Sequence, residues 1–313
     1  MRYIADLREG EQVQEHYLCV NKQVLKTRAG KTYYSLKLQD KTGVVDAKIW
    51  DLNDGINDFN EHEYIKIDAL VITFQNSIQL NIRRLRKSSE GEYDPREYIP
   101  VSNRDIGEMY EELLVYVHAI ENKYLSTLVK KFFIEDRDFI SIFKSHTAAK
   151  TMHHSYLGGL LEHTLCVLNM CEFLANQYTM INKDILYTAA LFHDVGKMNE
   201  LSAFPIIEYT DPGQLLGHIV ITIEWISDEI RQIVGFPDAL GNMVKHCILA
   251  HHGELEYGSP KKPQTIEALA LHFADNCDAK LRTFTDLLEG SEVEGNWLGF
   301  QRIFDSNVRR TKF

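Results

Sequence analysis

The stretch TAALFHDVGK, residues 188–197, ends an apolar run with an adjacent histidine and aspartate, His193 and Asp194, and continues with Gly196 and Lys197. Apolar residues recur here at three-to-four spacing, which is the period of an amphipathic helix with one buried face. A histidine and an aspartate at the end of such a helix are two polar, potentially metal-ligating groups in the interior of a domain. The stretch therefore predicts a helical domain built around a polar centre.

The same helical period continues through most of the chain beyond residue 100. Helices are predicted over residues 105–120, 126–134, 158–178, 183–197, 217–234, 240–252 and 266–288. Gly196 is expected to stop the helix that carries His193. This second part of the chain is predicted to be all-α.

Before residue 90 the pattern is different, because apolar and polar residues alternate. In residues 32–40 and 77–83 this alternation predicts strands with one buried and one wet face. With residues 13–25, 44–50 and 63–74 they make five strands, and residues 51–62 are expected to hold a short helix. Five strands with a helix in that gap favour a small all-β OB-fold barrel, although other small barrels fit the same alternation.

A change in composition separates the two parts. The stretch KSSEGEYDPREYIP, residues 87–100, combines two prolines, a glycine and many charges, which is typical of a linker. The predicted organisation is an OB-fold domain over 1–90, linker and connecting helices over 91–145, a second, helical domain over 146–290 and a tail over 291–313.

Charge and cysteine content narrow the class of protein. The chain has a net charge of -11, but residues 1–90 carry 14 basic against 13 acidic residues, and the remainder carries 20 against 32. The five cysteines form no CxxC pair and fall mostly in apolar patterns, which indicates reduced thiols and a cytoplasmic protein. No apolar run approaches the roughly 18 residues of a membrane span, so no membrane partner is expected.

On the solvent-exposed faces of the predicted barrel, aromatic residues lie among basic residues. The candidates for nucleic-acid binding are Tyr33, Lys37, Lys48, Trp50 and Arg83. Aromatic rings stack on bases and cations follow a phosphate backbone, which suits single strands without base readout. An ordinary solvated strand face with surface lysines explains the same pattern equally well.

Histidines gather in the helical part, where they attach to predicted core helices. His163, for example, lies in line with Leu160 and Val167 on an apolar stripe. A single histidine on an apolar stripe is more often a core residue with hydrogen-bond partners in the protein than a metal ligand. Several imidazoles and two carboxylates, however, lose much hydration free energy when they are buried together. A divalent metal centre would satisfy them all. The set is His163, His193, Asp194, His218, His251, His252 and Asp275.

This ordered set resembles the extended metal-binding signature of the HD-domain phosphohydrolases, which are all-α proteins that bind one or two divalent cations. The resemblance implies that His163, His193, Asp194 and Asp275 surround a first metal. It implies that His218, His251 and His252 complete a second, with Asp194 as the bridge. Two metals sharing a solvent molecule suit phosphodiester hydrolysis. Lys197 could contact a phosphate oxygen, or simply cap a helix C-terminus.

The resemblance extends to the YhaM-type 3′→5′ exoribonucleases, through the OB-fold, HHSYLGGLLEHT (153–164) and ADNCDAKL (274–281). It implies stepwise release of nucleotides from the 3′ end of single-stranded RNA, with single-stranded DNA as a further candidate substrate. Asp194 and Lys197 would act at the reacting phosphate. His153 and His154 would hold that phosphate or protonate the leaving oxygen. Lys280 could reach the substrate. Structural pairing of both histidines to backbone is an equal alternative, and Lys280 could form an ordinary surface pair.

The ligand types also bear on the metal. Mixed nitrogen and oxygen donors without a thiolate favour Mn, Co, Fe or Mg over structural zinc, and the resemblance makes two Mn ions the first choice. The sequence leaves open whether the chain forms a homo-oligomer.

Three other functions fit parts of the sequence. A cyclic-dinucleotide phosphodiesterase would use a similar metal set, but Tyr257-Gly258-Ser259-Pro260 breaks the Gly-Tyr-Pro order of that class. A nucleotide phosphohydrolase would act on mononucleotides and not on oligomers. A non-catalytic single-strand or DNA-binding factor would keep its metals for structure only.

Overall fold

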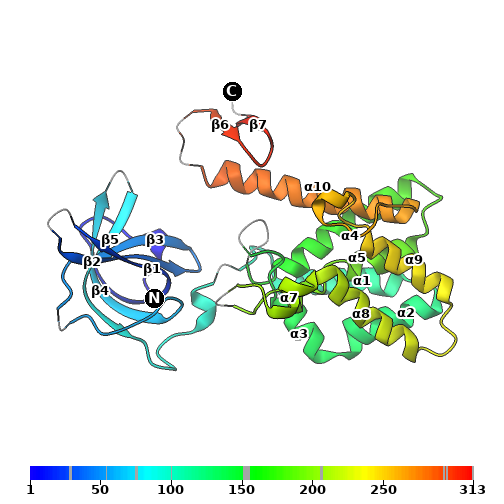
Figure 1. Ribbon diagram of the computed structural model, residues 1–313, viewed down its shortest axis with the longest axis horizontal. Helices are drawn as coiled ribbons and strands as arrows, with labels where there is room; N and C mark the ends of the chain where they lie inside the picture. Colours follow the sequence, from blue (N-terminus) through cyan, green and yellow to red (C-terminus); the bar gives the residue numbers. More distant parts are fainter. Residues whose placement is uncertain are drawn as a thin grey trace. The chain divides into compact units, whose positions relative to one another are not determined.

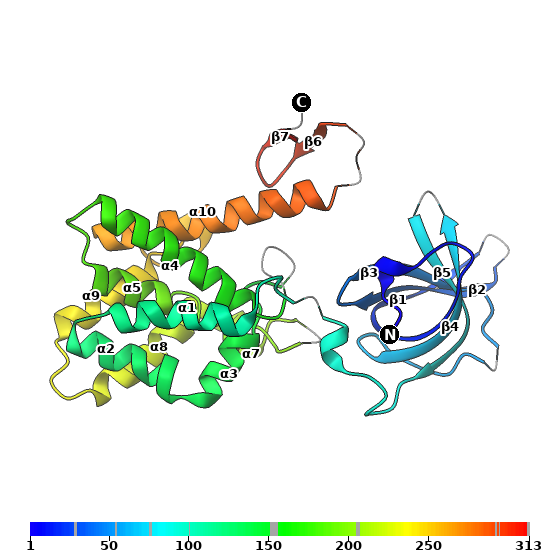
Figure 2. The same cartoon turned by 180° about the vertical axis from the view of Figure 1, so that it is seen from behind.

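The computed structural model describes residues 1–27, 30–53, 55–74, 77–99, 101–150, 156–204, 207–291, 293 and 295–311 (Figures 1 and 2). The internal contacts of the chain divide it into two units. The first unit contains Met1–Val101 with Ala203–Ile207, and the second contains Ser102–Ser202 with Glu208–Phe313.

The first unit is a closed barrel of five strands. They are β1 (Gln12–Lys26), β2 (Thr32–Asp40), β3 (Gly43–Ile49), β4 (Tyr64–Phe74) and β5 (Ser77–Lys87). Their order around the barrel is β1-β2-β3-β5-β4, with β3 and β5 parallel and the other neighbours antiparallel. This is the topology of the OB-fold, so the predicted fold of the first part is confirmed.

The alternation seen in the sequence sorts side chains between the inside and the outside of this barrel. Leu36 of β2 pairs in register with Ala47 of β3, and both are buried in the core together with Leu38 and Ile49. The outward neighbours include Tyr33, Ser35, Lys37 and Lys48, together with the exposed apolar Val44.

The helix expected over residues 51–62 is not found in the described residues of that segment. Instead the backbone runs beside β5, where Asn57 N donates to Leu85 O and Leu85 N donates to Gly55 O. Asn53 accepts a hydrogen bond from Gly55 N through its side chain, which is a turn that competes with a helix. Phe59 then enters the barrel core, which holds the segment in this extended form.

Residues 87–99, predicted as a linker from their composition, pack in part against the barrel. The rings of Tyr64 and Tyr93 stack with centroids 3.9 Å apart, and Tyr98 is buried beside Leu18. The prolines and charges of this segment are consistent with its irregular backbone. Tyr93 and Tyr98 nevertheless pack with Tyr64 of β4 and hold the segment against the barrel.

The second unit is mainly helical. Its elements are α1 (Ile106–Ala119), α2 (Lys123–Lys130), η3 (Lys131–Glu135, a π-helix), α3 (Arg137–Ser145), α4 (Gly159–Gln177), α5 (Lys183–Phe192), α6 (Lys197–Glu200), α7 (Asp211–Leu215), α8 (Gly217–Gln232), α9 (Asp238–Leu249) and α10 (Ile266–Glu289). The apolar stripes of α1 to α5 and α8 to α10 meet in one core. An all-α domain after the barrel is therefore confirmed.

The chain after α10, predicted as a tail, forms a hairpin of β6 (Trp297–Gln301) and β7 (Ser306–Arg309) (Figure 1). Among the residues that the structure describes, no helix is both long and apolar enough to cross a membrane.

Candidate metal centre and active site

The seven predicted ligands come from five places along the helical unit and meet in its interior. His163 lies on α4, and His193 and Asp194 directly follow α5. The others are His218 at the start of α8, His251 and His252 directly after α9, and Asp275 in the middle of α10. Because α4, α5, α9 and α10 pack against one another in the core, these helix positions converge on one site.

One group of ligand atoms forms around His163. Its Nε2 lies 3.1 Å from His193 Nε2 and 3.3 Å from both Asp194 Oδ2 and Asp275 Oδ1. One donor atom each from His163, His193 and Asp194 fit within 4.8 Å of one another, and all three side chains are buried. Two imidazoles and two carboxylates at such spacing can hold one cation.

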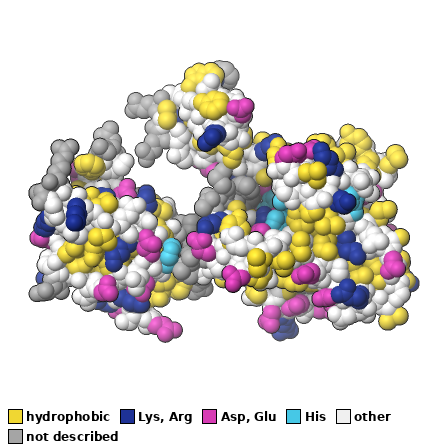
Figure 3. All heavy atoms as spheres, in the orientation of Figure 1, with side chains coloured by type: hydrophobic (Ala, Val, Ile, Leu, Met, Phe, Trp, Pro, Cys, Tyr) yellow, Lys and Arg dark blue, Asp and Glu magenta, His cyan; other side chains and the backbone are white. Residues whose placement is uncertain are grey.

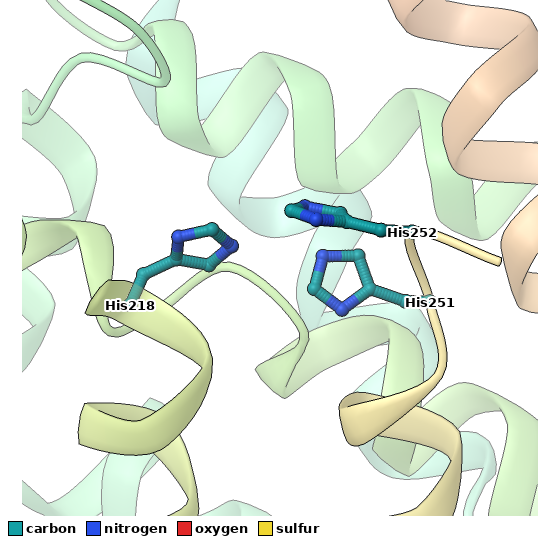
Figure 4. A group of neighbouring side chains, drawn as sticks. All are labelled: His218, His251 and His252. Atoms are coloured by element: carbon teal, nitrogen blue, oxygen red, sulfur yellow. The ribbon is translucent and has the colours of Figure 1, made fainter. Parts of the chain in front are cut away.

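A second group forms beside the first (Figure 4). His218 projects from α8 towards His251 and His252, and donor atoms of these three histidines also fit within 4.8 Å. His218 Nε2 and His251 Nε2 lie 3.4 and 3.8 Å from Asp194 Oδ1. Asp194 therefore turns Oδ2 towards the first group and Oδ1 towards the second, as a bridging carboxylate does.

Each of the five histidines has its Nδ1 engaged by an oxygen of the protein. The acceptors are Asp278 Oδ2 for His163 (2.7 Å), Ala190 O for His193 (2.8 Å), Glu200 Oε1 for His218 (3.0 Å), Ile248 O for His251 (2.7 Å) and Tyr257 O for His252 (3.0 Å). An imidazole that donates from Nδ1 presents the lone pair of Nε2. The tautomers set by these bonds suit metal ligands.

Three buried atoms at the centre test whether a metal fits. Asp194 Oδ1, His218 Nε2 and His251 Nε2 have no hydrogen-bond partner in the described part of the chain. Leaving a buried carboxylate oxygen without a partner is costly, but a divalent cation beside these atoms would compensate for that cost. The residues present thus fit a divalent metal centre, and their nitrogen and oxygen donors match the metals expected from the sequence.

Burial and neighbouring charges shift the pKa values of several ligand side chains. Burial holds the pKa of His251 well below its ordinary value, so the imidazole is neutral. Burial alone would raise the pKa of Asp194, but the charge of Lys197 and the neighbouring histidines outweigh it and hold that pKa well below the ordinary range. His163 differs, because its three carboxylate neighbours outweigh burial and raise its pKa, so they favour a positive charge there. A bound cation supplies the same positive charge.

Lys197 lies beside the metal-ligand cluster and lines the same cavity as His163 and Asp194. Its Nζ donates to Asp194 Oδ2 at 2.7 Å. The cavity has a volume of about 240 Å³ and its lining includes Lys197, His252, Tyr257, Asp275 and Asn276. The lysine begins α6 and does not cap the C-terminus of α5, so the alternative of a simple helix cap does not apply.

Gly196 has a different role from the helix stop that the sequence suggested. Its backbone is right-handed helical, with φ -61°, so no left-handed stop is formed. A Cβ at this position would lie 2.1 Å from His218 O and 2.7 Å from Thr222 Oγ1. The glycine is needed because α8 passes directly over the turn that carries His193 and Asp194.

Two residues of the site were not identified from the sequence. Asp278 is 8% exposed and accepts the hydrogen bond from His163. It stands three positions after Asp275, on the same helix face, and this spacing was a usable signal. Glu200 accepts hydrogen bonds from both the backbone N and the Nδ1 of His218, and no pattern in the sequence points to it.

Three other residues of the helical unit were predicted to contact the substrate. His153 and His154 lie outside the described residues. Lys280 is exposed on α10 and is not among the residues that line the cavity.

The barrel brings together the aromatic residues predicted to bind nucleic acid. The rings of Tyr33 and Trp50 stack with centroids 4.6 Å apart on the outer face of β2 and β3. Lys48 on the same face donates to Ser35 Oγ at 2.6 Å, and Lys37 Nζ lies 3.5 Å from an oxygen of Asp46. Arg83 is exposed on β5.

The fold and the buried histidine–aspartate centre define the class of HD-domain metal-dependent phosphohydrolases, and the family model described as "HD domain" matches residues 160–280. Three relatives named 3′-5′ exoribonuclease YhaM are similar over 90% of this chain. They come from Geobacillus sp. (strain WCH70), Bacillus velezensis and Bacillus subtilis, are 34%, 32% and 31% identical, and are covered over 86%, 88% and 88% of their own lengths. The chain belongs to the YhaM 3′-5′ exoribonuclease family.

Among solved structures, the second OB-fold domain of replication protein A from Methanococcus maripaludis is similar to 29% of this chain and is covered over 98% of its length. The identity is 13% and the TM-score is 0.24, and at that level the similarity carries no argument about function.

Proposed function

We propose that this enzyme shortens single-stranded RNA from its 3′ end by metal-dependent hydrolysis of the terminal phosphodiester. The observation that carries the proposal is the pair of histidine groups joined by the two oxygens of Asp194. Membership of the exoribonuclease family supports the substrate and the direction of degradation. Single-stranded DNA, which has the same phosphodiester linkage, is the further candidate substrate.

The metals would be divided between the two groups, with manganese as the proposed ion. His163, His193 and Asp275 would hold the first ion and His218, His251 and His252 the second, with Asp194 shared. When bound, two divalent ions lower the pKa of an attacking water and neutralise charge on the phosphate.

The protein's own groups would prepare this chemistry. Lys197 holds Asp194 in place through its hydrogen bond and presents a positive charge at the cavity, where a phosphate oxygen of the terminal nucleotide would lie. Hydrogen bonds from Nδ1 keep the five imidazoles oriented, so little reorganisation is needed when substrate binds. His153 and His154 stay predicted contacts of the scissile phosphate or of the leaving oxygen.

The barrel would gather the strand. The stacked Tyr33 and Trp50 offer an aromatic surface for bases, and Lys37, Lys48 and Arg83 offer charge for phosphates. Lys280, exposed on α10, remains a proposed contact of the same strand. The five free cysteines support the proposal that this takes place in the reducing cytoplasm.

The test follows a 5′-labelled, unstructured 24-nucleotide RNA with the pure protein and Mn²⁺. A descending ladder is expected from wild type and from Asp286→Asn, an exposed aspartate farther along α10, but not with EDTA or in Asp194→Asn. An RNA blocked by a 3′-phosphate should resist degradation while a 5′-blocked one does not. If the RNA stays intact and mononucleotides are hydrolysed instead, the enzyme is a nucleotide phosphohydrolase and the proposal is wrong.

A further inference from the structure

The hairpin after α10 carries two aromatic side chains on one face. Trp297 pairs in register with Arg309, and Phe300 pairs with Asn307. The register shifts between Trp297 and Gly299, and Gly299 has φ +81°, so the strand contains a glycine bulge with one extra residue. Because alternate residues of β7 share a face, Arg309 and Asn307 lie together, and the bulge brings Trp297 and Phe300 to that same face.

The other face of the hairpin is fixed to the end of α10. Leu298 and Val308 are buried, and the ring of Phe304 contacts that of Phe284 on α10, with centroids 4.9 Å apart. The guanidinium of Arg310 donates to the carbonyl oxygens of Leu288, Ser291, Val293 and Gly295. The hairpin is therefore anchored to the helix that carries Asp275.

The outer face is exposed and carries the positive charge of Arg309. Trp297 is 58% exposed and Phe300 is 60% exposed, and Figure 3 shows hydrophobic side chains at the surface of this region. The guanidinium carbon of Arg309 lies 5.9 Å from the centroid of the Trp297 ring. Residues 295–311 contain three arginines and one aspartate, whereas residues 91–294 contain 16 basic and 31 acidic residues. This face is a small basic aromatic surface on a chain segment that is otherwise acidic.

We propose that Trp297, Phe300 and Arg309 form a second binding site for single-stranded RNA, on the helical unit itself. The proposal rests on the proposed function and adds a contact for the strand on the 5′ side of the metal centre. Exposed rings stack on bases of any sequence, and an arginine beside them contacts phosphates. A single strand is favoured over other occupants because its phosphates are attracted to this positive face and its bases match the two rings.

The length of α10 predicts which substrates use this site. At a rise of about 1.5 Å per residue, Phe284, which the hairpin contacts, lies about 14 Å along the helix from Asp275, and Glu289 lies about 21 Å from it. A stacked strand advances about 3.4 Å per nucleotide, so about four to six nucleotides cover that distance. A dinucleotide in the metal centre would not reach the hairpin, whereas a 24-mer would engage both.

The first experiment measures binding without turnover. A fluorescent, unstructured 24-nucleotide RNA is titrated in EDTA with wild type, with the double variant Trp297→Ala/Phe300→Ala and with a control variant, Phe173→Ala. Phe173 is an aromatic residue of α4 that is exposed to a similar degree. The double variant should raise Kd by at least about fivefold, the lower end of what one stacked base contributes, and the Phe173 variant should stay within about twofold. Trp297→Tyr/Phe300→Tyr keeps two rings and should bind like wild type. Arg309→Gln should lower the slope of log affinity against log salt by about 0.7.

The second experiment compares KM for a 24-mer and for a dinucleotide with Mn²⁺. The double variant should raise KM for the 24-mer only, and its thermal melting should match wild type. An equal rise for both lengths, or an unchanged Kd, would overturn the second site. So would light scattering that shows a wild-type dimer and a monomeric double variant, because the face would then bind a second copy. If wild type cleaves neither RNA, the proposed function is wrong, whereas the titration in EDTA still tests whether the hairpin binds single-stranded RNA.

Discussion

Asp278 gives the sharpest test of how the metal centre is built. Its Oδ2 accepts a hydrogen bond of 2.7 Å from Nδ1 of His163, and the carboxylate is buried. The bond fixes the ring so that Nε2 faces His193 and Asp194. Asp278→Ala removes the acceptor and leaves a buried N–H group unpaired, without touching any proposed ligand atom.

A hydrogen bond to a charged group in such a place contributes about 1.5–3 kcal/mol. Loss of a group that orients a metal ligand typically weakens metal binding or activity about 10–100-fold, which corresponds to about 1.4–2.7 kcal/mol. We therefore expect Asp278→Ala to raise the Mn²⁺ concentration for half-maximal activity about 10–100-fold. Asp278→Asn keeps an acceptor oxygen without the charge, so its shift should be smaller.

The assay measures RNA cleavage across a Mn²⁺ series and obtains kcat at saturating metal for each variant. Asp286→Asn, an exposed aspartate on the same helix, serves as the matched control and should behave like wild type. The reasoning would be refuted if Asp278→Ala had an unchanged metal requirement, or if its activity were lost and did not recover at high Mn²⁺.

Three further predictions concern other parts of the molecule. Gly196→Ala should lower the free energy of unfolding by about 1–3 kcal/mol, because its Cβ would overlap His218 O; a melting temperature equal to that of wild type would contradict the close packing. Trp50→Ala should weaken binding of single-stranded RNA by about 1–3 kcal/mol per lost base stack, measured by anisotropy in EDTA, and an unchanged Kd would exclude the Tyr33–Trp50 surface as a binding site. In the native protein, Cys277 alone should react rapidly with a thiol reagent, since it is the exposed one of the five cysteines; several fast thiols would show that the helical core opens.

Periodicity in the sequence was sufficient to locate most of the helices and strands. The helix predicted over 158–178 is α4 (Gly159–Gln177), and the strand predicted over 32–40 is β2 (Thr32–Asp40). These elements bury a continuous face, so tertiary packing and local pattern favour the same structure. The order of histidines and aspartates then indicated the site, because each lies on or beside a core helix.

What the sequence did not reveal depends on contacts between distant segments. Residues 51–62 are extended because Phe59 enters the barrel and the backbone bonds to Leu85, and neither partner is local. The glycine at 196 is required by the approach of His218 O from α8. Glu200 finds His218 only when α6 and α8 are packed together. The hairpin after α10 was missed because two short strands around a bulge do not show the regular alternation of a strand.

The central claim is that the histidine–aspartate cluster holds two divalent metals that share Asp194. The most direct measurement is anomalous scattering from crystals of the protein soaked in Mn²⁺, recorded at the manganese absorption edge. Two peaks about 3.5–4 Å apart are predicted, one against His163, His193 and Asp275 and one against His218, His251 and His252, with Asp194 between them. A single peak, peaks elsewhere, or no manganese at these residues at millimolar concentration would contradict the account.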